Sequence, residues 1–147
     1  MRREFPIRGA LLACALALLA MAAGCASSSA GMAGDQYNLD FSVTKFNPHN
    51  GETLAVAVVD AESGKVIAKQ SGKVVDNTAS FTFSRILSKG KTYYVDFYAD
   101  HNKNGVCDDP PADHEWRLSV GPVDGNMTAT MAHNVNFTKV CSDFGSM

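Results

Sequence analysis

The chain has 147 residues and a formal net charge of −2. Residues 1–24 contain three arginines and one glutamate, so the rest of the chain has 10 basic and 14 acidic residues, a net charge of −4. No basic stripe and no cluster of aromatic and basic residues occurs. Nucleic acid is therefore not an expected partner.

The first 24 residues have the layout of a secretory signal. Arg2, Arg3 and Arg8 give a positive start, and an apolar run of 14 residues follows at 10–23. As a helix this run would be about 21 Å long, shorter than the ~20 residues that cross a bilayer. We expect residues 1–24 to be a cleaved signal peptide.

The stretch "MAAGC" at Met21–Cys25 resembles the bacterial lipobox, whose cysteine is lipidated and becomes the mature N-terminus. Ala22 departs from the leucine usual in that motif, and cleavage by the ordinary signal peptidase near residues 20–22 is the alternative. The resemblance implies a lipid anchor on Cys25. It also implies an outer-membrane location, because no Asp follows the cysteine. Residues 25–36 are then the lipidated cysteine and a flexible tether, whose last eleven residues have a reach of about 18 Å.

After residue 36 apolar and polar residues alternate, which indicates β-strands. Turn sequences such as "NPHNG" and "GPVDGN" separate seven candidates. Seven short strands in a domain of this size predict a single seven-stranded antiparallel β-sandwich, immunoglobulin-like or transthyretin-like, over residues 37–147. The expected strands are Tyr37–Phe46, Thr53–Ala61, Lys65–Lys73, Thr78–Leu87, Lys91–Asp100, Glu115–Val120 and Met127–Thr138.

Every second residue of these strands should face the core. The expected inward residues are Leu39, Phe41, Val43, Leu54, Val56, Val58, Phe81, Phe83, Tyr93, Val95, Phe97, Trp116, Leu118, Val120, Met127, Ala129, Met131 and Val135.

Successive strands of a sandwich run from one end to the other, so alternate loops share an end. The first loop, the fifth loop and the segment after the seventh strand should therefore lie at one pole. These segments and the close of the seventh strand contain all four histidines, His49, His101, His114 and His133, and the cysteines Cys107 and Cys141. In an exported protein we expect Cys107 and Cys141 to form a disulfide. Functional residues should also lie at this pole.

The loop "DHNKNGVCD" at Asp100–Asp108 fits the pattern D-x-N-x-N-G-x-x-D. It resembles the first half of an EF-hand loop and, more closely, the nine-residue calcium loops of integrin β-propellers. Calcium would bind the side chains of Asp100, Asn102, Asn104 and Asp108 and the carbonyl of Val106, with a Kd of about 10⁻⁴–10⁻³ M. The alternative is a turn-rich loop that binds no ion.

The histidines raise a second metal hypothesis. His49, His114 and His133 would suit copper or zinc. However, no two of these histidines have the close spacing of a metal motif such as H-x-H. His133 also has the same parity as the inward residues of the last expected strand, which favours a place at the edge of the core. No nucleophile motif such as G-x-S-x-G occurs, so we do not expect an enzyme.

Three stretches, "FNPHNGETLAVAVVD", "YYVDFYADHNKNGVCDDPPADHEWRLSV" and "HNVNFT", resemble a group of small exported bacterial β-sandwich proteins of unassigned role. The phrase "DFYADHNKNG" is also similar to a strand and loop of transthyretin-like bacterial surface domains. The resemblance implies the fold and export, and no catalytic residue. We therefore expect a lipid-anchored binding or structural module with calcium in the loop at 100–108, which contacts another envelope protein. The alternative is a periplasmic copper- or zinc-binding protein.

Overall fold

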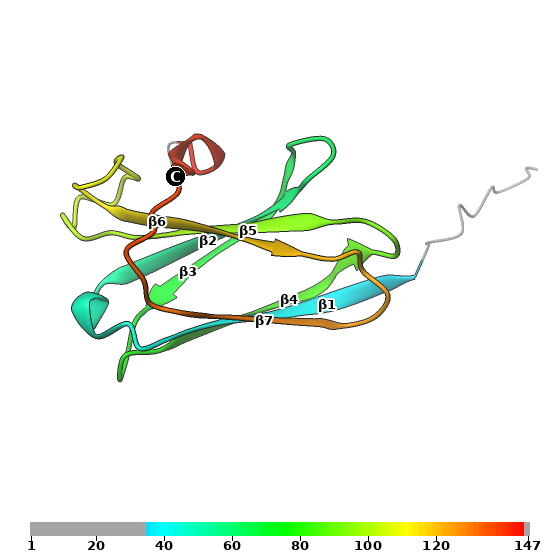
Figure 1. Ribbon diagram of the computed structural model, residues 1–147, viewed down its shortest axis with the longest axis horizontal. Helices are drawn as coiled ribbons and strands as arrows, with labels where there is room; N and C mark the ends of the chain where they lie inside the picture. The colour runs from blue at the N-terminus through cyan, green and yellow to red at the C-terminus, as the bar shows by residue number, and fades with distance from the viewer. Residues whose placement is uncertain (1–34, 146–147) are drawn as a thin grey trace, which may run out of the picture. The chain divides into compact units, whose positions relative to one another are not determined.

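The computed structural model describes residues 35–145, which form seven β-strands and two short 3₁₀ turns. Figure 1 shows the strands in two layers. Six of the seven predicted strands agree with the structure to within two residues at each end. The elements are β1 (Gln36–Thr44), η1 (Asn47–His49), β2 (Thr53–Asp60), β3 (Val66–Lys73), β4 (Ala79–Ser88), β5 (Tyr93–Ala99), β6 (His114–Val120), β7 (Met127–Ala132) and η2 (Cys141–Asp143).

One layer is a three-stranded sheet in the order β4-β1-β7, and the other is a four-stranded sheet in the order β3-β2-β5-β6. All pairs are antiparallel except β1 and β7, which pair in parallel. The prediction of a wholly antiparallel fold is therefore wrong at this pair. The first and last strands run in the same direction because six alternating reversals separate them, as the strand order along the chain requires.

The hydrophobic core lies between the two sheets and contains inward side chains of both. Phe41 of β1 packs against Phe97 of β5 with ring centroids 4.9 Å apart, and Phe97 stacks on Trp116 of β6 at 5.5 Å. All three rings are buried. Full burial of one such side chain contributes roughly 1.5–3 kcal/mol. The inward residues that period-two alternation predicts in both sheets therefore form one shared hydrophobic core.

The last strand is shorter than predicted, ending at Ala132 instead of Thr138. The backbone N–H of His133 still donates to the carbonyl of Thr44, but Thr138 already donates to the carbonyl of Glu115 in the opposite sheet. The chain therefore crosses from one sheet to the other at this end. Val135 is 74% exposed because it lies in the crossing, so its predicted place in the core is wrong.

The C-terminal segment covers the outer face of the four-stranded sheet. Val140 and Phe144 pack with Ala55, Ala57 and Tyr98 in a second, smaller hydrophobic cluster. Because this cluster covers the second face of β2, every residue of that strand from Leu54 to Asp60 is buried rather than every other one.

The predicted signal peptide, Cys25 and nearly all of the tether lie outside the described residues. Within residues 35–145, no helix is both long enough and apolar enough to span a membrane.

Candidate metal centre

The first and fifth loops meet at one end of the molecule, as the strand-direction argument predicted. A carboxylate oxygen of Glu52, just after η1, lies 2.8 Å from Nδ1 of His101 in the long loop. His49 lies beside His114, where that loop enters β6. His133 reaches the same place from the end of β7, with its ring centroid 5.1 Å from that of His49. All four histidines therefore gather at this pole.

His49 is held at the centre of the group by the turn that contains it. Pro48, the second residue of η1, has the fixed backbone angle that a 3₁₀ turn needs, and the N–H of His49 donates to the carbonyl of Phe46. The ring is fully buried between Phe46 and Trp116, at centroid distances of 5.5 and 5.6 Å. These contacts fix the orientation of the imidazole.

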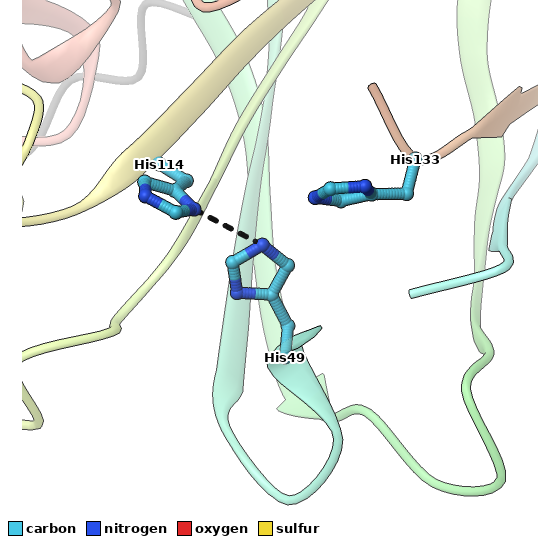
Figure 2. A group of neighbouring side chains, drawn as sticks. All are labelled: His49, His114 and His133. Carbon is cyan, nitrogen blue, oxygen red and sulfur yellow. Dashed lines mark hydrogen bonds between the residues drawn. The ribbon is translucent and has the colours of Figure 1, made fainter. Parts of the chain in front are cut away.

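His49, His114 and His133 point toward one another (Figure 2). Nε2 of His49 lies 3.2 Å from Nδ1 of His114, and one ring nitrogen from each of the three histidines lies within 4.8 Å of the other two. Nε2 of His133 is buried and has no hydrogen-bond partner among residues 35–145. A buried polar atom without a partner is costly, so a ligand for this nitrogen would relieve the cost.

The other two rings are also anchored by their elements. His114 is the first residue of β6, in register with Ala99, and its ring stacks on Phe137 at 4.4 Å. His133 is anchored through the hydrogen bond of its backbone to Thr44. Its ring lies edge-on to Phe46 at 5.3 Å. Aromatic side chains thus pack against all three imidazoles.

Glu52 orients the central histidine. One of its carboxylate oxygens lies 2.8 Å from Nδ1 of His49, and the other binds His101. The tautomer in which Nδ1 of His49 donates its proton to Glu52 has a lone pair on Nε2, the nitrogen that faces His114, and this lone pair can bind a metal. Glu52 was not predicted as a functional residue, although its place three residues after His49 in the first loop was the available signal.

The protonated form is disfavoured for two of the three histidines. Burial lowers the pKa of His114, and neighbouring histidines lower it further. Burial also lowers the pKa of His133, with a smaller contribution from His49. Neutral imidazole is the form that binds metals, so the site favours its ligand state near neutral pH.

The geometry fits a small transition-metal ion. Two imidazole nitrogens bound tetrahedrally at 2.0–2.1 Å from zinc are about 3.3 Å apart, close to the 3.2 Å between His49 and His114. The third nitrogen would have to move inward by a modest side-chain rotation. Three nitrogen donors suit copper or zinc and do not suit calcium, which takes oxygen ligands.

The loop predicted to bind calcium brings four of its five proposed ligands together. The amide nitrogens of Asn102 and Asn104 donate to Asp108 at 2.8 and 2.6 Å, and Asp100 accepts the backbone N–H groups of Asn104 and Gly105. These bonds lower the pKa of Asp108, with Asn102 contributing most. Val106 donates its N–H to Asn104 and is half exposed. Calcium would need the amide oxygens of the two asparagines, so it would have to rearrange the loop.

Asp113 organises the same loop from its other end. It is fully buried, and its carboxylate accepts the backbone N–H groups of His101 and Asp108 at 2.9 and 3.0 Å. This residue was not predicted as a functional residue. It fixes the position of His101 relative to the other histidines.

The two remaining cysteines are linked. Cys107 and Cys141 form a disulfide that ties the long loop to the C-terminal segment. Their sulfurs lie near Glu115 but are not available as metal ligands while they are bonded to each other. The Glu115 side chain is fully buried, and one of its oxygens has no hydrogen-bond partner among the residues that the structure describes. Burial raises the pKa of Glu115 despite hydrogen bonds from Val140 and Cys141.

No protein-family model matches the chain, and none of the curated proteins is significantly similar to it.

Proposed function

We propose that this protein binds a copper or zinc ion in the bacterial cell envelope through His49, His114 and His133. The observation that carries the proposal is the convergence of three imidazoles, one from the first loop, one from the first residue of β6 and one from the residue directly after β7. One nitrogen from each ring lies within 4.8 Å of the other two, and Nε2 of His133 has no hydrogen-bond partner within the described part of the chain. The proposed role is binding rather than catalysis.

Copper is the ion that we propose for tightest binding. Among divalent first-row metals, nitrogen sites bind Cu²⁺ most strongly, and three neutral imidazoles with an open fourth position suit both Cu²⁺ and Zn²⁺. His114 and His133 are partly exposed, so an ion could reach the site from solvent without unfolding the core.

Isothermal titration of the purified protein with Cu²⁺ and with Zn²⁺ tests this function. His133→Gln and His114→Gln should each weaken binding of the first ion by about 100-fold or more, since loss of an outer-shell partner alone costs 10–100-fold. His101→Gln is the matched control, because it removes a histidine that lies at the same pole but is not one of the three proposed ligands. The proposal would be overturned if the protein bound neither ion, or if His133→Gln and His114→Gln both bound the ion as tightly as the wild type.

The cellular setting is part of the proposal. Export by residues 1–24, lipidation of Cys25 and an outer-membrane location are supported by the N-terminal sequence, and another envelope protein is the expected partner. The immunoglobulin-like or transthyretin-like type of fold is supported by the strand count and the two facing sheets. Mass spectrometry of the protein from membrane fractions tests the anchor, because a diacylated Cys25 should be the first residue.

Calcium in the loop at 100–108 stays a separate prediction with a structural role. Its support is that Asp100, Asn102, Asn104 and Asp108 meet in one loop. A calcium ion there would stabilise the loop that contains His101, and would thereby help to hold His101 near the other three histidines.

A further inference from the structure

We propose that the imidazole of His49 bridges two metal ions, so that the pole forms a dinuclear centre. The first ion is the one held by His49, His114 and His133, and the inference rests on that proposed function. The second ion would be a divalent transition metal bound by the other nitrogen of His49, together with Glu52 and His101.

The two nitrogens of His49 face two separate sets of donors. Nε2 lies on the side of His114 and His133. On the opposite edge of the ring, Nδ1 lies 2.8 Å from Glu52, and the three donor atoms of His49, Glu52 and His101 lie within 4.8 Å of one another. Each edge of one ring therefore has two further ligands, which is the arrangement that a bridging imidazolate requires.

Glu52 does more in this structure than orient one histidine. Its carboxylate is nearly buried, and each oxygen contacts a different imidazole, at 2.8 Å in both cases. Within residues 35–145 its ion-pair partners are those two histidines alone, with no lysine or arginine. A buried carboxylate between two imidazoles is a strong donor set for a divalent cation, because charge and nitrogen ligands converge.

Access distinguishes the second site from the first. The His101 side chain is 49% exposed, whereas His49 is fully buried. The outer site therefore has protein on one side and solvent on the other, and water can complete the coordination shell. The ring of His101 also stacks on that of His114, with the ring centroids 5.1 Å apart. A ligand of the outer site therefore packs directly against a ligand of the inner site.

Charge and protons balance without a further reactant. A neutral imidazole has one N–H proton, and on binding of the second ion the Nδ1 proton of His49 passes to solvent. The imidazolate and Glu52 then offset two of the four positive charges of the two ions. The second ion should bind more weakly, because it must displace the hydrogen bonds of Glu52 and immobilise a half-exposed side chain.

Cu²⁺ titration with electron paramagnetic resonance tests the bridge. The wild-type protein should bind two Cu²⁺ ions, and its spectrum should lose intensity at the second equivalent, since coupling through the ring pairs the two spins. His101→Gln should bind one Cu²⁺ ion with the full spectrum of an isolated ion. Glu52→Gln should give the same stoichiometry. Circular dichroism melting of both variants checks that they are folded.

The outcomes separate the two proposals. Binding of a single Cu²⁺ ion by the wild type, lost in His133→Gln, would overturn the dinuclear centre and leave the proposed function standing. Two ions whose spectra simply add would also overturn the bridge. Absence of Cu²⁺ binding altogether would overturn both proposals.

Discussion

Nε2 of His49 lies 3.2 Å from Nδ1 of His114, although 65 residues separate the two histidines along the chain. The contact joins the first loop to the beginning of β6. It exists because strands that alternate in direction return the chain to the same pole after each even number of crossings. The candidate metal centre is therefore a direct consequence of the strand order.

The apo protein should lose stability on acidification below pH 6.5. The pKa values of His114 and His133 are lowered in the folded state, so the unfolded chain takes up protons first as the pH falls through 6.5. Their contribution is complete above 6.5 and is lost as the pH falls to the folded values. The slope is at most about 1.4 kcal/mol per pH unit for each proton. Thermal melts with a chelator present should show a smaller slope in His114→Gln/His133→Gln, and an unchanged slope would contradict the assignment.

Glu115→Gln should stabilise the protein at pH 7. The pKa of Glu115 is raised above 4.5 by burial, so the folded state binds the extra proton and stability falls as the pH rises from 4.5 through the folded value. The amide keeps an oxygen for the N–H groups of Val140 and Cys141 and removes a buried charge. We expect a gain of about 1 kcal/mol at pH 7 that shrinks toward pH 4.5, measured by urea denaturation.

Glu115→Leu provides the contrast for that experiment. It removes the acceptor of two backbone N–H groups at the start of η2. Each orphaned donor should cost about 1–3 kcal/mol. A leucine variant as stable as the glutamine variant would show that these hydrogen bonds do not hold the C-terminal segment.

Loss of the disulfide should destabilise the fold without dispersing the histidines. The link closes a separation of 34 residues, and the chain-entropy estimate for such a loop is about 3–4 kcal/mol. Cys107→Ser/Cys141→Ser should therefore have a markedly lower melting temperature. His114 and His133 lie within the segment that the disulfide closes, but the side chains that hold the three imidazoles in place are Phe46, Glu52, Trp116 and Phe137 rather than either cysteine. The folded variant should therefore retain Zn²⁺ binding. Zn²⁺ titration below the melting temperature checks this, and loss of binding would show that the link shapes the site.

Asp108→Ala should abolish any rise in melting temperature that calcium produces. Asp108 gathers the side chains of Asn102 and Asn104 and would supply a charged ligand. Stabilisation by an ion follows its concentration relative to Kd, so millimolar Ca²⁺ is the useful range for a weak site. A calcium-dependent shift that survives the substitution would exclude the proposed ligands.

Much of this pole could be predicted from strand direction alone. The alternation of apolar and polar residues predicted which residues of β1 and β5 face the core. The reversal of direction from strand to strand predicted that His49 and His101 lie at the same end. The pairing of β1 with β7 could not be predicted, because the order of strands within a sheet does not follow from alternation. The exposed position of Val135 was not predicted, because β7 ends where its backbone stops pairing with β1, and the sequence pattern does not show that point.

The contacts of Glu52 lay beyond a sequence-based prediction for a different reason. Side-chain direction in a loop follows the turn geometry and has no period. The 3₁₀ turn at Asn47–His49 is what directs His49 inward and places Glu52 beside it. The sequence could bring the two residues to the same end, but it could not show that one carboxylate joins two histidines.

Anomalous X-ray diffraction at the zinc edge, from crystals of the zinc-loaded protein, would locate the bound ion relative to the three histidines. We predict a strong peak about 2.0–2.1 Å from one ring nitrogen each of His49, His114 and His133. A map with no peak among these three rings, or with zinc bound only at other residues, would contradict the account.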